Sequence, residues 1–225
     1  MPCRVASESV FARDYRHWHF KHWILAAAAA AAVVLSAGVL HGALPTDSDT
    51  SGRTSFAGQL LIAAPALQGS PFERTVIVMA QHSREGAMGI VINRPLGERP
   101  IADLLQTFGI DATGIKDSVR VFLGGPVGRE VGFVVHSADY HLTNTIDIDG
   151  KIAFTAAPDV LRDIGHGKGP GKSLVAFGYA GWGPSQLDDE IARGDWYNVT
   201  EDPALVFDDD RANVWADAMA RRKEH

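Results

Sequence analysis

Polar residues beside glycine-rich turns are the part of this sequence best placed to do chemistry. Four short segments follow or interrupt apolar runs: His82, Asn93-Arg94-Pro95, Gly124-Gly125-Pro126 and residues 178–183 (GYAGWG). Glycine allows tight turns and a close approach of backbone to ligand, and an arginine at a strand end can bind a carboxylate. The candidate ligand- or partner-binding residues are His82, Asn93, Arg94, Gly124, Gly125, Tyr179, Trp182 and Gln186. The competing interpretation is that the glycines only turn the chain and that Trp182 packs in the core.

Residues 165–173 (GHGKGPGKS) end like the phosphate-binding loop of nucleotide-binding proteins. That motif has a glycine five residues before the glycine of its Gly-Lys pair, and here His166 occupies the position. The surrounding pattern also predicts a helix before the loop and a strand after it. A phosphate-binding loop runs the other way, from a strand into a helix. We therefore predict a flexible, basic loop rather than a nucleotide site.

His136 and His141, five residues apart, form the beginning of a metal-ligand set. A third ligand would have to come from Asp139, Asp147 or Asp149, and a strand-end turn with solvated side chains explains the same residues. Cys3 is the only cysteine, which excludes a zinc site built on cysteines and an intramolecular disulfide. We predict no metal site and no cofactor.

The charge of the chain argues against direct nucleic-acid binding. The formal net charge is −6, and residues 55–225 carry 16 basic and 23 acidic side chains. Affinity for nucleic acid depends largely on Lys and Arg that displace counterions from phosphates. Binding would need a local basic face assembled from Arg94, Arg99, Arg120 and Arg129.

The elements expected to position these residues are short strands mixed with a few helices. Apolar and β-branched runs predict strands at residues 59–64, 75–80, 88–93, 119–123, 131–136, 152–155, 173–179 and 196–199. Amphipathic spacing and charge placement predict helices at residues 101–108, 158–164, 184–193 and 211–222. Such a mixture, without a long linker or an internal repeat, predicts one α+β domain with a mixed or antiparallel sheet.

Residues 1–54 differ from the rest and are assigned to an N-terminal extension, with the domain at residues 55–225. Residues 23–40 are uncharged; Arg13, Arg16 and Lys21 precede them and a polar run follows. This order suits a signal peptide or a membrane anchor. Two alternatives remain open, namely a soluble alanine-rich helix and a start codon assigned too far upstream.

Several of these segments together resemble the AlgH/YqgE family of bacterial proteins. The matching blocks are residues 58–65 (GQLLIAAP), 86–96 (GAMGIVINRPL), 122–126 (FLGGP), 132–136 (GFVVH) and 174–191 (LVAFGYAGWGPSQLDDEI). The resemblance implies a single α+β domain with a bifurcated sheet that includes a small closed β-barrel surrounded by helices. It also implies a cytoplasmic location, with anchoring in the inner membrane or export through residues 23–40 as the alternative.

Two functions remain in competition at this point. The first is a non-enzymatic regulatory or interaction domain that binds a protein partner or a small effector. It agrees with the absence of a complete catalytic set and with the description of some family members as transcriptional regulators, which we expect to act indirectly. The second is a small-molecule or nucleotide-binding protein, or an enzyme, that uses the glycine-rich turns with His82 and Arg94. It requires those residues to converge in one cleft.

Overall fold

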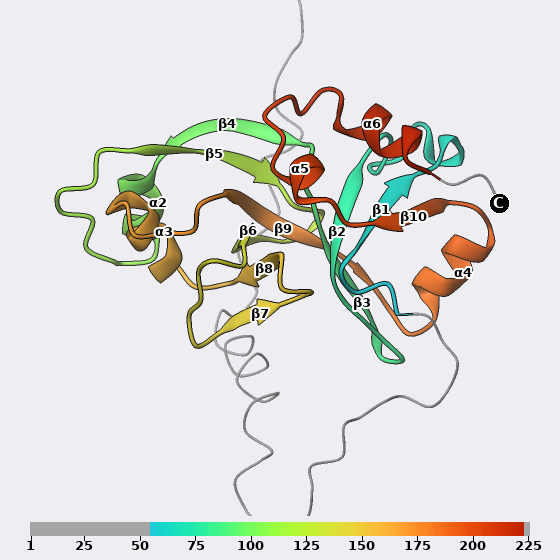
Figure 1. Ribbon diagram of the computed structural model, residues 1–225, viewed down its shortest axis with the longest axis horizontal. Helices are drawn as coiled ribbons and strands as arrows, with labels where there is room; N and C mark the ends of the chain where they lie inside the picture. The colour runs from blue at the N-terminus through green and yellow to red at the C-terminus, as the bar shows by residue number, and fades with distance from the viewer. Residues whose placement is uncertain (1–54, 223–225) are drawn as a thin grey trace, which may run out of the picture. The chain divides into compact units, whose positions relative to one another are not determined.

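The apolar runs of the sequence become strands of one branched, ten-stranded sheet (Figure 1). The computed structural model describes residues 55–222; residues 1–54 and 223–225, including the predicted anchor at 23–40, lie outside the described part. The strands are β1 (Gln59–Ala63), β2 (Val76–Ser83), β3 (Gly86–Val91), β4 (Pro95–Pro100), β5 (Ser118–Leu123), β6 (Val127–Ser137), β7 (Thr145–Asp147), β8 (Ile152–Thr155), β9 (Ser173–Trp182) and β10 (Trp196–Thr200).

Five α-helices and one short 3-10 helix accompany the sheet in the described residues. They are η1 (Pro65–Leu67), α2 (Ile101–Thr107), α3 (Asp159–Gly165), α4 (Gln186–Ala192), α5 (Pro203–Val206) and α6 (Val214–Ala220). Within residues 55–222, no helix has the length and apolar character that crossing a membrane requires.

The sheet branches along β9, which changes partner part-way along one edge. Residues 175–177 of β9 pair in parallel with β5, whereas residues 180–182 pair antiparallel with β3. Gly178 lies between these two stretches with φ +76°, a conformation that favours glycine. The other edge of β9 pairs with β6. The parallel pair makes the sheet mixed, and the change of partner makes it bifurcated, as predicted.

The closed barrel implied by the family resemblance is not observed among the described strands. Pairing follows the open path β10-β1-β2-β3-β9-β6-β8-β7, with β4 and β5 attached as a ribbon beside β9. Figure 1 shows the β4–β5 ribbon arching away from the rest of the sheet toward α2 and α3. Residues 55–222 therefore form a single mixed α/β domain with a curled, mostly antiparallel, open sheet.

Strands β1, β2 and β3 are buried on both faces, which explains their continuous apolar runs. On one face Leu60, Val78 and Ile90 belong to a core cluster that includes residues of α5 and α6. On the other face Leu61 and Ile77 belong to a cluster that includes α4. A third cluster packs α2 and α3 against β5, β6 and β9.

The elements missed by sequence pattern are short or lie at an edge. Strand β4 (PLGERP) contains two prolines and a glycine, a composition that normally predicts a loop, and all six of its residues are exposed. An edge strand tolerates proline because one row of its N–H groups needs no partner strand. Strand β7 and helix α5 have only three and four residues, too few for a periodic pattern.

Candidate functional site

The two glycine-rich segments meet, but residues 178–182, predicted to form a turn, belong to strand β9 and pack closely against Gly124 and Gly125, which leaves little room for a ligand. The Gly124 N–H donates to the Phe177 carbonyl and its own carbonyl accepts from Val91, both at 2.8 Å. A β-carbon at Gly124 would overlap the carbonyl oxygen of Gly178, and one at Gly125 would overlap the Tyr179 backbone. These glycines are needed where the end of β5 crosses β9 at the branch of the sheet.

Tyr179 lies at the same crossing and is partly buried. Its ring contacts Phe133 edge-on, with 6.0 Å between centroids. Burial raises the pKa of the Tyr179 phenol, and the charge of Glu130 adds to the effect. Its ring therefore packs against the sheet.

Asn93 and Arg94 hold the loop that leads into β2. The Asn93 amide accepts from the Val76 N–H at 3.0 Å and donates to the Arg74 carbonyl at 2.9 Å. Arg94 donates to the carbonyl oxygen of Glu73. Arg74 has φ +52°, so these contacts hold a turn in a conformation that non-glycine residues rarely adopt. Both side chains support the backbone of residues 73–76.

Trp182 and Gln186 belong to a hydrogen-bonded cluster around Glu190 of α4. The indole N–H groups of Trp182 and Trp196 both donate to the same Glu190 oxygen at 2.8 Å. The Gln186 amide donates to the other oxygen at 2.9 Å and accepts from the Gly183 N–H at 3.1 Å. Trp182 is 8% exposed and packs in the core cluster under α4. The structure thus supports the packing interpretation of Trp182.

His82 lies on the same three-stranded face as Trp182. It pairs across the strands with Ala87, which in turn pairs with Trp182. The His82 ring stacks on Phe56, and its Nδ1 accepts from the Phe56 N–H at 3.2 Å. The neutral ring therefore carries its proton on Nε2, which faces Asp188 at 3.6 Å. His82 connects β2, α4 and the start of the described chain.

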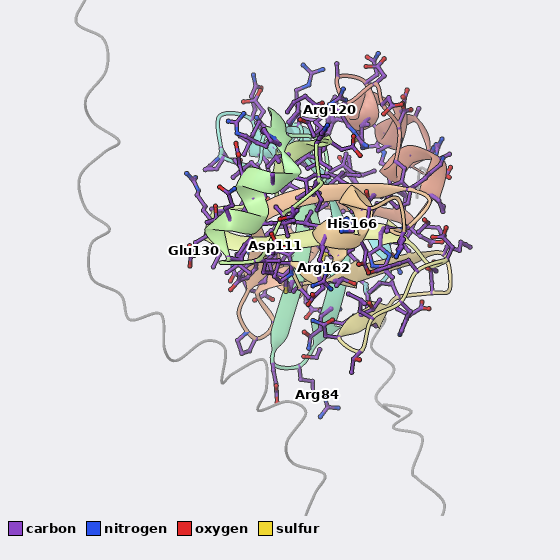
Figure 2. The ribbon with its side chains drawn as sticks, turned by 90° about the vertical axis from the view of Figure 1, so that its left-hand side faces the viewer. Arg84, Asp111, Arg120, Glu130, Arg162 and His166 are labelled. Atoms are coloured by element: carbon purple, nitrogen blue, oxygen red, sulfur yellow. The ribbon has the colours of Figure 1, made fainter. Side chains whose placement is uncertain are left out.

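The structure does not bring His82 and Arg94 together. They lie near opposite ends of the β2–β3 hairpin, since His82 is beside the turn whereas Arg94 follows β3 at the other end. The six residue-to-residue steps from Val76 to His82 span about 20 Å. Figure 2 shows Arg84, at the tip of this hairpin, far from Arg120. The predicted residues therefore form two structural groups, one at α4 and one at the branch of the sheet.

His136 is fully buried in a chain of hydrogen bonds. Its Nδ1 lies 2.9 Å from the Ser137 carbonyl, which can only accept, so Nδ1 carries the proton. Nε2 then accepts from the Thr155 hydroxyl at 2.9 Å, Thr155 accepts from Thr145 at 2.7 Å, and Thr145 accepts from the Leu142 N–H at 2.9 Å. Every group is satisfied with a neutral imidazole, and burial lowers the pKa of His136.

The glycine-rich loop at residues 165–172 is tied to the turn that follows β6. Asp139 accepts from the Ser137 hydroxyl at 2.6 Å and from the Gly171 N–H at 3.0 Å, and these bonds lower the pKa of Asp139. The loop connects α3 to β9, the reverse of a phosphate-binding loop, as predicted. In residues 55–222, no three His, Cys, Asp or Glu side chains are arranged to hold a metal ion.

A cleft lies beside the β4–β5 ribbon and contains none of the eight candidate binding residues predicted from the sequence. It encloses about 220 Å³ between the β4–β5 ribbon, the start of β9 and the segment that connects α5 to α6. Figure 2 shows Arg120 at this end of the molecule. The cleft combines two guanidinium groups with apolar walls and a hydroxyl, being lined by Glu98, Val119, Arg120, Phe122, Ser173, Val175, Asp209 and Arg211.

Arg120 is held at one side of the cleft by long contacts. Its Nε lies 3.3 Å from a Glu98 carboxylate oxygen, and one of its terminal nitrogens donates to the Asp209 carbonyl at 3.4 Å. The side chains of Arg120 and Glu98 are 45% and 59% exposed. Such an exposed ion pair contributes little stability and can rearrange at small cost.

Arg211 is the more deeply buried of the two cations. It donates to the Val206 carbonyl at 2.7 Å, and its guanidinium lies over the Phe122 ring, 5.1 Å from the centroid. Its Nε is buried and has no hydrogen-bond acceptor among the described residues. Burial lowers the pKa of Arg211; the charges of Asp209 and Asp208 oppose that shift, and Arg120 adds to it.

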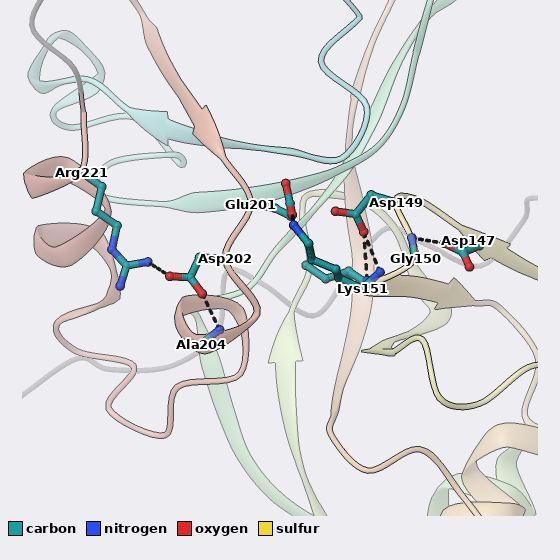
Figure 3. Close-up of polar contacts among 9 residues, drawn as sticks. Asp147, Asp149, Gly150, Lys151, Glu201, Asp202, Ala204 and Arg221 are labelled. Atoms are coloured by element: carbon teal, nitrogen blue, oxygen red, sulfur yellow. Dashed lines mark hydrogen bonds and ion pairs between the residues drawn. The ribbon is translucent and has the colours of Figure 1, made fainter.

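Contacts at both ends fix the chain that forms one wall of the cleft (Figure 3). Asp202 caps α5 by accepting from the Ala204 N–H at 2.8 Å, and Arg221 at the end of α6 donates to the other Asp202 oxygen. Beside them, Lys151 donates to Glu201 at 2.6 Å. The segment between Asp202 and Arg221, which contains α5 and α6, is thus held together at its two ends by the contact between these two side chains.

Sequence reasoning missed this cleft because its residues are far apart in the chain. Arg120 entered only as part of a hypothetical basic face, and Arg211 only as the start of a predicted helix. Arg120 and Phe122 stand two apart on β5, the spacing of one strand face, but that signal recurs in every strand. The approach of Asp209 to Arg120 spans 89 residues and leaves no local pattern.

Comparison with known proteins identifies the class to which this single mixed α/β domain belongs. The family model described as AlgH-like matches residues 60–225. A UPF0301 protein of Afipia carboxidovorans is 40% identical over 186 residues, covering 79% of this chain and 89% of that protein. A UPF0301 protein of Rhodospirillum rubrum is 44% identical over 164 residues, covering 73% and 85%. The chain belongs to the AlgH-like family.

Two solved structures have the same fold. The AlgH protein of Pseudomonas aeruginosa superposes with a TM-score of 0.65 at 34% identity, covering 81% of this chain and 92% of that chain. A Corynebacterium diphtheriae protein gives a TM-score of 0.58 at 22% identity, covering 74% and 86%, and shows likeness of fold alone. Membership confirms the family predicted from the sequence motifs.

Proposed function

We propose that this domain is a non-enzymatic effector-binding domain with regulatory function, and that its effector occupies the cleft between the β4–β5 ribbon and the α5–α6 connection. The observation that carries the proposal is the placement of Arg211 in this cleft, half-buried over Phe122 with an unsatisfied Nε. Burying a cation with an unused donor is costly, and binding sites are where proteins keep such groups.

The two guanidinium groups of the cleft are suited to binding and not to proton transfer. Guanidinium groups stay protonated at any physiological pH, so Arg120 and Arg211 orient and hold a ligand but do not act as acid or base. Phe122, Val119 and Val175 add apolar contact area, and Ser173 adds a hydroxyl. Charged and polar residues outnumber the apolar ones in the lining, so we expect charged groups of the cleft to select its ligand.

The alternative function, an enzyme or nucleotide-binding protein built on His82 and Arg94, has less support. This function requires His82 and Arg94 to share one cleft. The two residues instead lie at opposite ends of the β2–β3 hairpin. Direct nucleic-acid binding is also disfavoured, since residues 55–225 carry 16 basic and 23 acidic side chains. We propose instead that any influence on transcription is indirect, through a protein partner that senses the bound state.

We further propose that the domain acts in the cytoplasm, as the family resemblance implies. Cell fractionation followed by intact-mass measurement tests this together with residues 1–54. A soluble product beginning near residue 55 supports the proposal. Full-length protein in the membrane fraction contradicts it and supports an anchored form.

Chemical-shift mapping tests the effector site itself. The ¹⁵N-labelled full-length chain is titrated with small aromatic fragments, both neutral and anionic, and amide shifts are followed. Shifts centred on Arg120, Ser173 and Arg211 support binding in the cleft. Shifts centred on another part of the domain, or no shifts at millimolar concentrations, overturn it.

A further inference from the structure

We infer that the cleft recognises its effector by a carboxylate or phosphate group, and that this group takes the place of the Glu98 carboxylate on Arg120. The inference rests on the proposed effector site and goes further by naming the chemical class of ligand. It also gives Glu98 a role, as a carboxylate of the chain itself that competes with the ligand.

The charge arrangement around the two arginines supports an anionic ligand. Arg120 and Arg211 line the same small cleft, where the carboxylates of Glu98 and Asp209 offset their charge, and an oxyanion that displaces Glu98 would take over its part. Guanidinium groups bind carboxylate and phosphate through paired N–H donors, a geometry that a neutral ligand does not use.

Glu98, the ionic partner of Arg120 in the structure, binds Arg120 more weakly than such an anionic ligand would. The contact from Arg120 Nε to Glu98 is 3.3 Å, longer than the 2.7–2.9 Å of a good charge-assisted bond. Glu98 lies on β4, whose six residues are all exposed, and its side chain is 59% exposed. It can therefore swing into solvent when a better-placed oxyanion enters.

The size and walls of the cleft limit the rest of the ligand. A volume of about 220 Å³ is below the range of about 300–1,000 Å³ for drug-sized sites, so the ligand is small. Val119, Phe122 and Val175 provide apolar contacts beside the arginines. The class that fits is a small carboxylate or phosphate monoester with a short, flat or apolar body.

Calorimetric titration of full-length protein with three matched probes tests the class. Benzoate and phenyl phosphate carry the two anions, and benzamide is their neutral counterpart. We expect the anionic probes to bind at least about tenfold more tightly than benzamide, because paired charged hydrogen bonds are lost in the neutral probe. The relative affinities of benzoate and phenyl phosphate decide between carboxylate and phosphate.

Variants of the cleft test the competition by Glu98. Glu98→Gln should tighten the binding of the preferred anion about two- to fivefold, since it removes a weak ionic competitor. Arg211→Gln and Arg120→Gln should each abolish measurable binding. Arg94→Gln is the matched control, an exposed arginine outside the cleft, and should bind like the unmodified protein. Circular dichroism melts verify that each variant is folded.

The outcomes separate this inference from the proposed function. If benzamide binds the cleft as tightly as the anions, or if Glu98→Gln leaves affinity unchanged or weakens it, the oxyanion inference is wrong although the cleft still binds a ligand. If no probe binds, or if Arg94→Gln and Arg211→Gln have equal effects, both proposals are wrong.

Discussion

A β-carbon at Gly178 would lie 2.5 Å from the carbonyl oxygen of Gly125. This relationship assigns the two glycine-rich turns their role, because each glycine lacks a side chain at the point where the other strand crosses. Gly178 also has φ +76° and marks the point where β9 changes its partner strand. The conspicuous glycines of the sequence are thus required by the branched sheet.

Replacement of Gly178 by alanine should therefore destabilise the domain strongly. We expect a loss of about 3 kcal/mol or more, from overpacking against backbone and an unfavourable φ. Gly114→Ala is a matched control, because Gly114 has φ +82° but open space around its Cα. The control should lose only about 1 kcal/mol. Urea denaturation followed by circular dichroism measures both, and equal losses would refute the crossing argument.

Trp182 is expected to act through packing and through its hydrogen bond to Glu190. Trp182→Ala should lower the free energy of unfolding by about 3–5 kcal/mol, since it removes a large buried side chain. Trp182→Phe keeps most of the ring and loses the N–H donor, so the loss should be about 1–2 kcal/mol. Guanidinium denaturation monitored by far-ultraviolet circular dichroism measures the difference. Unchanged stability of Trp182→Ala would contradict the packing role of Trp182.

Asn93 is expected to matter for stability and not for ligand binding. Asn93→Ala removes the acceptor of the Val76 N–H and the donor to the Arg74 carbonyl. Loss of these bonds should cost about 1–3 kcal/mol. Replacement of the exposed Asn144 by alanine serves as the control and should change stability by less than about 0.5 kcal/mol. Thermal and urea unfolding measure both, and weaker binding of the anionic probes to a folded Asn93→Ala protein would contradict this assignment.

Sequence pattern predicted the central strands well because both faces of β1, β2 and β3 are covered. Short, continuous, β-branched apolar runs such as residues 75–80 are typical of strands covered on both faces. The pattern failed for β4, where Pro95, Gly97 and Pro100 indicate a loop although pairing with β5 makes a strand. For an edge strand, the partner and not the intrinsic propensity decides the conformation.

The candidate site was harder to predict than the fold. His82, Arg94 and Trp182 stand out in sequence because they are polar or aromatic residues near glycine-rich segments, and in the structure they contact neighbouring backbone or helix α4. Arg120 and Arg211 carry no local motif, and only the fold of the segment between α5 and α6 brings them to one cleft. When tertiary packing assembles a site from distant segments, its residues have no characteristic spacing in the sequence from which the site could be predicted.

The buried His136 should make the stability of the domain depend on pH. Its pKa is lowered in the folded state because the imidazole is buried, whereas in the unfolded chain it has its ordinary value of about 6.5. Below that pH the unfolded chain binds a proton that the folded domain does not, so acidification favours unfolding. The contribution of His136 is fully present above about pH 6.5 and is lost as the pH falls toward the folded-state pKa.

The slope of stability against pH tests this assignment of His136. One such group adds at most about 1.4 kcal/mol per pH unit to the free energy of unfolding. Urea denaturation between pH 5 and 7.5 measures the slope. His136→Gln should flatten it, because glutamine does not titrate. If His136→Gln keeps the full slope, other groups account for the pH dependence. In that case, the series of hydrogen bonds that runs from Leu142 through His136 to Ser137 would not explain why the folded domain resists protonation.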